Sequence, residues 1–334
     1  MKRNGTLIIA ASAVAIALVT CFLVRSKRQP TYRGRTVNSW LEEIFDAKGN
    51  QGKAMNALRE LGAKAVPVQI EALTRTDSPL DKWYQSVYPK LPLWLQRRLP
   101  TPINAETMHS AAELALLNNE HTREFMPELE RCLKEGNSKV RLYAAGVVAD
   151  CIRAEDTFCI PTLIEVLNDR DARVRDYAAH ALSRFGPAAK AAAPALEKGL
   201  KDSEAQVRIT AAMALSAMDT NTATLTIPVL KEAITSGDPR TRYWAAVYLG
   251  KIDPEDRGTI PVFTSSLTNE NRDIRISAAY SLLRYGPEAK GAAPALVNAL
   301  HDPDADVRRA ARRVLEKIDP EAAVQAGGAH GQDH

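Results

Sequence analysis

The sequence lacks the short motifs that would indicate catalysis or a bound cofactor. It has no HExxH zinc motif, no GxSxG nucleophile turn, no glycine-rich phosphate loop and no CxxC pair. The histidines within the chain are scattered and stand at no regular spacing from a nucleophile: His109, His121, His180 and His301. A net charge of +4 over 334 residues is too small to indicate nucleic-acid binding. We therefore expect no catalytic residue, no metal, no cofactor, no nucleic acid and no small-molecule substrate.

Aromatic residues and cysteines are also few. Aromatics make up 6% of the chain, which is typical of a helical stack built from alanine and leucine. Of the four cysteines, Cys132 and Cys151 occupy positions that are apolar in related segments of the chain, so they are interpreted as core thiols. Cys159 lies eight residues after Cys151, and a disulfide there is an alternative to the free thiols that we favour.

A repeat of 33 or 34 residues dominates the chain. It is marked by a proline, by an arginine 14 residues later and by an alanine 17 residues later. The prolines are Pro127, Pro161, Pro194, Pro228, Pro261 and Pro294. The arginines are Arg141, Arg175, Arg208, Arg242, Arg275 and Arg308, and the alanines are Ala144, Ala178, Ala211, Ala245, Ala278 and Ala311. A period held this closely predicts stacked structural repeats.

Each unit of the repeat predicts two helices joined by a turn. In Ile160–Gly186, apolar residues follow the proline by two, five and six positions, which indicates a short amphipathic helix. The polar segment Asn168–Asp171 suits a turn and a helix cap. Apolar residues spaced by four, four and three from Val174 to Phe185 indicate a second helix. One unit cannot cover its own apolar face, so neighbouring units must complete the core.

These units resemble HEAT repeats, in particular the short, alanine-rich kind of bacterial proteins and phycobilin-lyase-like chains. The pattern Ile-Pro-x-Leu, an aspartate-containing turn and Val-Arg-x-x-Ala-Ala carry the resemblance, together with RFGPAAKAAAPAL and RYGPEAKGAAPAL. It is strong over residues 121–320 and weaker over 38–73. The resemblance implies an all-α, right-handed α-α superhelix of about seven to eight helical hairpins.

The same resemblance implies a binding protein, because this architecture offers a long surface of equivalent units. We expect a non-enzymatic scaffold with a protein partner that the sequence does not identify. A lyase-like or small-ligand-binding protein and a structural envelope protein remain the alternatives.

The start of the chain predicts a membrane anchor. Leu7–Val24 is free of charge, and as a helix it would be roughly 27 Å long, close to the thickness of the hydrocarbon core. Lysine and arginine flank it on both sides. A cleaved signal peptide and a lipid attachment at Cys21 are the alternatives. We expect a transmembrane segment within residues 1–28 and a single-pass protein of the bacterial inner membrane, with the side of the solenoid left open.

The rest of the chain is divided into segments that follow the repeat pattern to different degrees. We expect a juxtamembrane linker at 29–36, degenerate repeats at 37–120, the regular array at 121–320 and a disordered tail at 321–334. An insertion at 75–107 interrupts the degenerate repeats, and insertions in solenoids often carry function.

Two surfaces are candidates for partner binding. The first lies on the second helices, where aromatic residues stand outside the apolar stripe: Tyr143, Tyr177, Trp244 and Tyr248. The second is the insertion, which combines aromatic and basic residues: Trp83, Tyr84, Tyr88, Trp94, Arg97 and Arg98. Packing against a neighbouring repeat is the alternative for the first, and a local cap or a membrane interface for the second.

The recurrent arginine also suggests a phosphate or acidic-peptide site, but a structural role is favoured. Acidic residues recur in the turns nearby: Glu135, Asp169, Asp202, Asp238 and Asp302. In HEAT repeats a comparable arginine pairs with such an aspartate and joins adjacent units. Asn269 replaces the acid in one repeat, so the arginine ladder is not uniform.

Overall fold

The computed structural model describes residues 29–45, 50–92, 96, 102–236 and 238–328. The elements of the described residues are helices, apart from an antiparallel hairpin of β1 (Thr31–Tyr32) and β2 (Arg35–Thr36). The chain divides into two compact units, unit 1 at residues 1–152 and unit 2 at residues 153–334. The expected all-α repeat architecture is confirmed in both.

In its described residues, unit 1 contains the hairpin, three pairs of packed helices and a helix of the insertion. Its helices are α2 (Val37–Ile44), α3 (Gln51–Leu61), α4 (Val66–Leu73), α5 (Pro79–Val87), α7 (Ala105–Leu117), α8 (Met126–Glu135) and α9 (Ser138–Cys151). Helix α2 packs on α3, α4 on α7, and α8 on α9. Helix α5 comes from the insertion and separates the two members of the α4–α7 pair in sequence.

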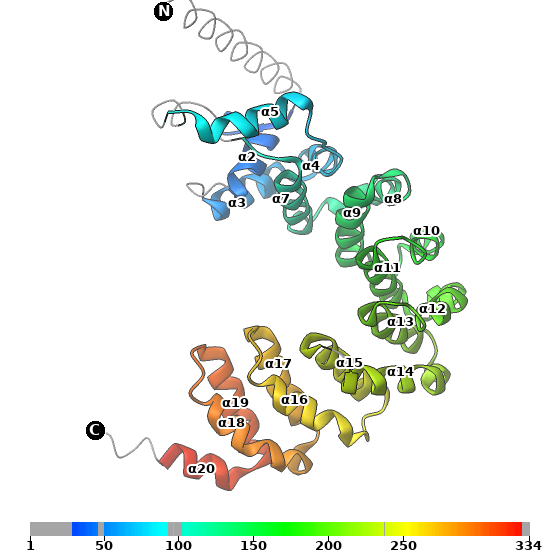
Figure 1. The fold of residues 1–334 in the computed structure, drawn as a ribbon, viewed down its shortest axis with the longest axis vertical. Helices are drawn as coiled ribbons and strands as arrows, with labels where there is room; N and C mark the ends of the chain where they lie inside the picture. Colours follow the sequence, from blue (N-terminus) through cyan, green and yellow to red (C-terminus); the bar gives the residue numbers. More distant parts are fainter. Residues whose placement is uncertain (1–28, 46–49, 93–95, 97–101, 237, 329–334) are drawn as a thin grey trace, which may run out of the picture. The chain divides into compact units, whose positions relative to one another are not determined.

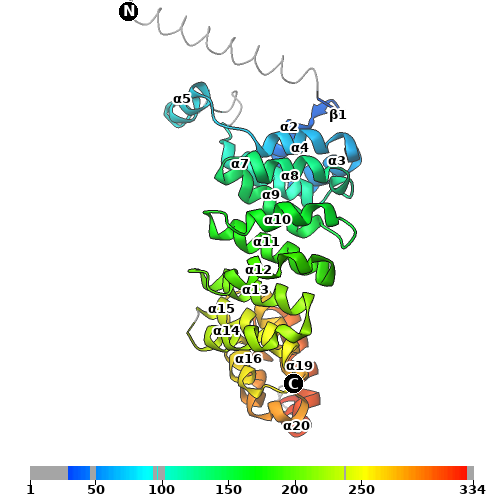
Figure 2. The same cartoon turned by 90° about the vertical axis from the view of Figure 1, so that its right-hand side faces the viewer.

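Unit 2 contains the regular pairs. Its helices are α10 (Ile160–Val166), α11 (Ala172–Phe185), α12 (Ala193–Gly199), α13 (Ala205–Met218), α14 (Ala223–Ser236), α15 (Pro239–Ile252), α16 (Ile260–Ser266), α17 (Arg272–Leu283), α18 (Ala293–Ala299), α19 (Ala305–Ile318) and α20 (Pro320–Gly328). The first helices α10 and α12 lie on one side, and the second helices α11 and α13 on the other (Figure 1). Consecutive pairs stack on each other (Figure 2).

Capping residues and prolines define the helix ends that the repeat pattern predicts. Side-chain oxygens of polar residues accept hydrogen bonds from the first turns of the second helices: Asn137, Asp171, Asp238, Asn271 and Asp304. The recurrent proline lies in the first turn of most first helices, where its missing N–H costs no helical hydrogen bond. Pro228 is the exception, because α14 begins earlier and contains it.

The recurrent alanine lies on the buried face of each second helix. All six side chains are fully buried or nearly so: Ala144, Ala178, Ala211, Ala245, Ala278 and Ala311. At Ala211 the neighbouring helix α12 contributes Gly199, and a methyl group added to that glycine would lie 3.1 Å from the Ala211 Cβ. Small residues on both sides therefore let α12 and α13 approach closely.

Two segments are more regular than expected. The insertion at 75–107 contains the helix α5, which begins with a capping box formed by Ser78 and Asp81. Part of the expected disordered tail forms α20, and α20 packs on α18 and α19. Since α20 covers the last pair of the array, it closes the apolar surface that a terminal repeat would otherwise expose.

The predicted membrane localisation is corrected. Among the residues that the structure describes, no helix combines the length and the apolar character needed to cross a bilayer. The second helices of unit 2 are 14 residues long at most, or about 21 Å, and the hydrocarbon core is about 30 Å thick. The anchor expected at 7–24, and the alternative of lipid attachment at Cys21, lie outside the described residues.

Candidate partner-binding face

Two arginines of the ladder bind an aspartate of the following repeat in unit 2. The Arg175 guanidinium donates two hydrogen bonds of 2.7 Å to the Asp202 carboxylate. Arg275 and Asp302 make the same paired contact at 2.8 and 2.9 Å. All four side chains are largely buried. These two arginines therefore join consecutive repeats, as the structural reading of the ladder expects.

The pairing sets the charge state of the aspartates. Burial alone would raise the pKa of Asp202, but hydrogen bonds from Arg175 and from the Glu204 N–H hold that pKa below its usual value. The pKa of Asp302 is lowered for the same reasons, by Arg275 and the Asp304 N–H. Both carboxylates stay ionised under ordinary conditions and keep the pairs intact.

A further role of the ladder is to close the turn within one repeat. The Nη1 group of Arg175 donates to the Asp169 carbonyl at 2.8 Å, and the equivalent group of Arg208 donates to the Asp202 carbonyl at 2.8 Å. Arg141, Arg275 and Arg308 make the same kind of contact with backbone carbonyls of their own turns. Arg242 occupies the same position in α15.

A polar cluster joins the second helices α11 and α13. The Thr210 hydroxyl donates a 2.6 Å hydrogen bond to the Asp176 carboxylate, and Gln206 donates to Thr210 at 3.3 Å. Burial raises the pKa of Asp176, although the hydrogen bonds from Thr210 and Gln206 and the positive charge of Arg240 act against it. Since Arg240 belongs to α15, a third helix also contributes to the electrostatic field at Asp176.

Helix α15 contributes an aromatic pair to the same cluster. The rings of Trp244 and Tyr248 stack with centroids 5.9 Å apart and planes inclined by 27°. Tyr243 packs edge-on against Trp244, with ring centroids 5.3 Å apart, and this contact restricts the indole ring. Burial, and to a lesser degree the charge of Asp176, raises the pKa of Tyr248 to about 12. Both rings of the pair are half-buried, so each keeps an exposed part.

We call this set of residues on α11, α13 and α15 the binding row: Asp176, Tyr177, Gln206, Thr210, Arg240, Trp244 and Tyr248. The predicted residues Trp244 and Tyr248 lie in direct contact. Tyr177 is half-buried and follows Asp176 in α11. The sequence analysis did not identify Asp176, although a signal was available. At its repeat position the other units carry Leu142, Ile209, Tyr243, Ile276 and Arg309, so an acid is unusual there.

Tyr143 belongs to unit 1 and packs against the preceding repeat. Its ring lies 5.4 Å from the His109 ring, and its hydroxyl lies 3.3 Å from the Ser110 hydroxyl. His109 is itself buried, and its Nε2 lies 2.7 Å from the Arg75 carbonyl. Tyr143 therefore serves the α7–α9 contact, which is the packing alternative for this position.

The insertion residues form a small aromatic group of their own. Tyr84 and Tyr88 meet edge to face at 5.7 Å, and the Tyr88 hydroxyl donates to the Gln96 carbonyl at 2.9 Å. Trp83 is 45% exposed on α5. Trp94, Arg97 and Arg98 lie outside the described residues. Part of the insertion therefore packs on itself, while Trp83 faces solvent.

No group of three or more His, Cys, Asp or Glu side chains is placed to hold a metal ion within the described part of the chain. The binding row offers aromatic surface, one carboxylate and one guanidinium, which are groups suited to recognition.

The repeats match a family model for HEAT repeats at residues 126–216, 193–284 and 260–326, together more than half of the chain. A search of curated proteins gave no match. Among solved structures, the complex of CpcE and CpcF of phycocyanin lyase from Nostoc sp. PCC7120 is 18% identical, with a TM-score of 0.45 over 80% of this chain and 97% of that chain.

Two further solved structures show a similar likeness. Human deoxyhypusine hydroxylase is 19% identical, with a TM-score of 0.33 over 81% of this chain and 91% of that chain. An engineered protein is 21% identical, with a TM-score of 0.41 over 87% of this chain and 82% of that chain. Similarities this low indicate neither a reaction nor a partner. The family assignment depends on the repeat model, and by that match the chain belongs to the HEAT-repeat family.

Proposed function

We propose that this chain is a non-enzymatic HEAT-repeat scaffold that binds a protein partner on the binding row of unit 2. The observation that carries the proposal is the stacked pair of Trp244 and Tyr248 beside the half-buried carboxylate of Asp176. Tryptophan, tyrosine and arginine are the residues that most often anchor protein interfaces. Here Trp244 packs against the edge of the apolar core, and both rings of the pair keep an exposed part.

The binding row suits a partner segment that has both apolar side chains and hydrogen-bond donors. The exposed parts of Trp244 and Tyr248 offer apolar and aromatic contact. The Asp176 carboxylate accepts hydrogen bonds from Thr210 and Gln206 and has further lone pairs for N–H donors. Packed helices hold these groups in place before binding, so association loses little conformational entropy on this side. An extended peptide segment with apolar side chains and free N–H groups meets these requirements.

Site-directed crosslinking in cells tests this proposal. A photoreactive residue at Lys251, which lies 5.9 Å from the Tyr248 ring, reports on the row. The same residue at Glu197, which is exposed on the first helix α12, is the matched control. We expect a discrete protein to crosslink from position 251 and to be absent from position 197. The same proteins captured from both positions, or none from position 251, would contradict the proposal.

A further inference from the structure

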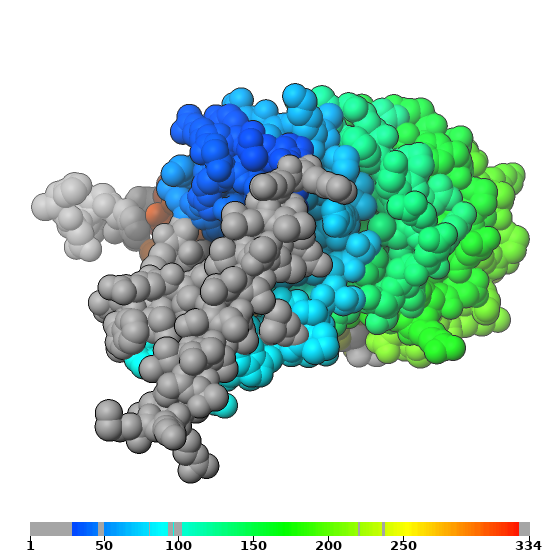
Figure 3. Space-filling view, turned by 90° about the horizontal axis from the view of Figure 1, so that it is seen from above, coloured from blue at the N-terminus to red at the C-terminus, as the bar shows by residue number. Residues whose placement is uncertain are grey.

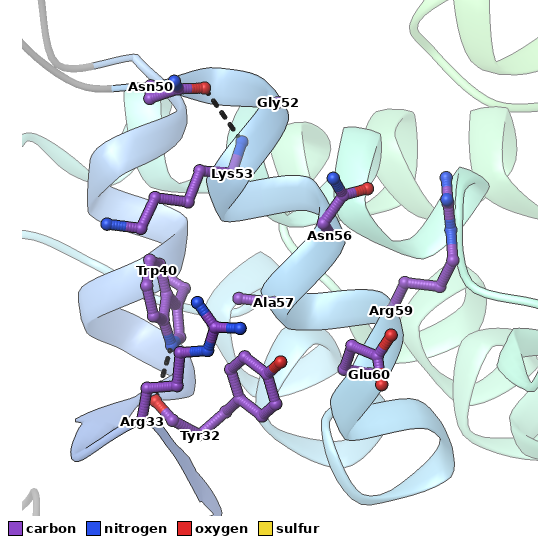
Figure 4. Close-up of a pocket in the computed structure, with 10 residues that line it drawn as sticks. All are labelled: Tyr32, Arg33, Trp40, Asn50, Gly52, Lys53, Asn56, Ala57, Arg59 and Glu60. Carbon is purple, nitrogen blue, oxygen red and sulfur yellow. Dashed lines mark hydrogen bonds between the residues drawn. The ribbon is translucent and has the colours of Figure 1, made fainter.

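The hairpin and α3 of unit 1 enclose an open pocket with a volume of about 750 Å³. Residues from the start of unit 1, coloured blue, lie at the surface in the view of Figure 3. The walls come from Tyr32 and Arg33 of the hairpin and from Lys53, Asn56 and Arg59 of α3 (Figure 4). The pocket is separate from the binding row, because all its residues belong to unit 1.

The basic residues at this pocket differ in whether they form an ion pair with an acidic residue. Arg35, just outside it, pairs with Glu43 and stacks over the Trp40 ring at 4.0 Å. Arg33, Lys53 and Arg59 form no ion pair with any residue in the described ranges, although Arg33 lies 5.3 Å from the Tyr32 ring and Lys53 lies 5.9 Å from the Trp40 ring. Glu60 is the one acidic residue of the lining. Among the described residues, the pocket therefore has a local excess of positive charge that no ion pair neutralises.

One of these basic residues, Arg33, has an unfavourable backbone conformation in the turn of the hairpin. Arg33 and Gly34 form the two-residue loop between the paired residues Tyr32 and Arg35, with φ angles of +51° and +75°. A loop with two positive φ angles favours asparagine followed by glycine, and arginine is unusual at the first position. Strained backbone at a ligand-lining residue is typical of functional sites. The presence of an arginine at this loop position is therefore better explained by a role of its side chain than by the conformation of the turn.

The spacing of the cations distinguishes between anionic ligands. Lys53 and Arg59 are six residues apart on α3, which separates them by about 9 Å along the helix axis and by about 120° around it. Figure 4 shows their side chains extending to different sides of α3. A single phosphate needs donors that converge on one point, and these do not. An extended peptide places alternate side chains about 7 Å apart on one face, so two of its carboxylates can reach separate cations. Glu60 would repel a nucleic-acid backbone, whereas it can accept a hydrogen bond from a peptide N–H.

We propose that the pocket between the β1–β2 hairpin and α3 binds a short acidic peptide segment of a partner protein. Carboxylates of the segment contact Lys53, Arg59 and Arg33, and the Asn56 amide donates to its backbone. Exposed ion pairs of this kind are individually weak, so the site adds affinity and orientation to a larger contact.

Fluorescence anisotropy with the full chain tests this proposal. The probe is a fluorescein-labelled peptide of alternating glutamate and serine, and the same peptide with glutamine in place of glutamate is the reference. The double variant Lys53→Gln/Arg59→Gln should bind the acidic peptide about tenfold more weakly. The variant Lys64→Gln/Lys82→Gln, which removes two exposed lysines of unit 1 outside the pocket, should retain the original affinity.

A third variant separates binding from folding. Arg33→Asn suits the turn better, so the melting temperature should stay the same or rise while affinity for the acidic peptide falls two- to fivefold. Equal affinities of the original chain and the Lys53→Gln/Arg59→Gln variant would overturn the proposal. Tighter binding of oligothymidylate, or displacement of the peptide by millimolar inorganic phosphate, would also overturn it in favour of another anion.

Discussion

Two kinds of repeat junction occur within unit 2, and they differ in one side chain of the turn. Where Asp202 or Asp302 stands in the turn, it pairs with an arginine of the preceding repeat. At the equivalent turn positions on either side of α15 the chain has Ser236 and Asn269, which carry no charge. The repeat that lies between these two positions also carries Trp244 and Tyr248. The junctions at Asp202 and Asp302 are therefore joined by an arginine–aspartate pair. The repeat between the two uncharged positions presents the aromatic pair, and it contacts the following repeat through Lys231 and Asp256 instead.

The comparison suggests how one repeated fold acquires a specific face. Stacking energy comes mainly from the buried alanines and the apolar stripe, which all units share. Arginine–aspartate pairs across a junction add to this stacking energy, but they are not present at every junction. Residues outside the shared stripe are therefore free to serve recognition, and in α15 they are aromatic.

The largest expected effect comes from breaking the shared packing in either kind of repeat. Ala211→Arg and Ala245→Arg each force a long charged side chain into a fully buried position between helices. We expect each to lower the free energy of unfolding by more than about 3 kcal/mol in urea denaturation. Ala188→Arg, at an exposed alanine, is the control and should change it by less than about 0.5 kcal/mol. Equal stability of Ala211→Arg and this control would refute the assigned helix faces.

A smaller effect is expected when a paired junction is converted into the other kind. Asp202→Asn introduces the amide that the chain itself has at Asn269 and leaves Arg175 without its charged partner. We expect this variant to lower the free energy of unfolding, measured by urea denaturation, by about 1 to 3 kcal/mol. Asp306→Asn, at a more exposed aspartate, should cost less than about 1 kcal/mol. If the two variants are equally stable, the buried pair does not contribute to the junction.

The cost of Asp202→Asn should also depend on pH. The pKa of Asp202 is lower in the folded chain than in the unfolded one, so its contribution is present in full above the unfolded value of about 3.9. It is lost as the pH falls from there through the folded value. The difference between the original chain and the variant should therefore be constant near pH 7 and shrink below about pH 4. A difference that grows in acid would contradict this assignment.

The aromatic repeat makes its own prediction about ionisation. Burial and the nearby Asp176 raise the pKa of Tyr248 to about 12, and Asp176→Asn removes the second of these causes. The ultraviolet titration of the variant, compared with a Tyr248→Phe reference, should show a lower pKa for this tyrosine that is still above 10, because burial remains. An unchanged titration would mean that Asp176 and Tyr248 do not share one site.

The smallest effect concerns a predicted contact residue that turned out to pack within unit 1. Tyr143→Phe removes the hydroxyl that lies 3.3 Å from Ser110 and keeps the ring against His109. The expected loss of stability is about 0.5 to 1 kcal/mol, measured by thermal melting. A loss above about 2 kcal/mol would show that this hydroxyl has a larger role in the α7–α9 contact.

The repeat period was enough to predict the fold, because each unit repeats its own boundary signals. Pro161 begins a first helix, Asp171 caps a second one, and Ala178 is buried between helices. The spacing also indicated that arginines such as Arg175 lie near acidic turn residues. These features are local or recur at a fixed interval, so they can be read from the sequence without knowing how the helices are rotated.

The remaining features depend on geometry that the period does not specify. The contact of Asp176 with Thr210 requires the rotation of α11 against α13. The pocket around Lys53 requires the hairpin to fold back on α3, and nothing in the repeat encodes that. The aromatic stacking of Trp244 on Tyr248 was easier to anticipate, because residues four apart face each other on a helix.

The central claim is that the aromatic pair of α15 holds a protein partner. The most direct test is crosslinking from Lys251 in the original chain and in a Trp244→Ala/Tyr248→Ala variant of matched melting temperature. We predict that the protein captured by the original chain disappears from the variant. Capture of the same protein in the same yield by both chains would contradict the claim.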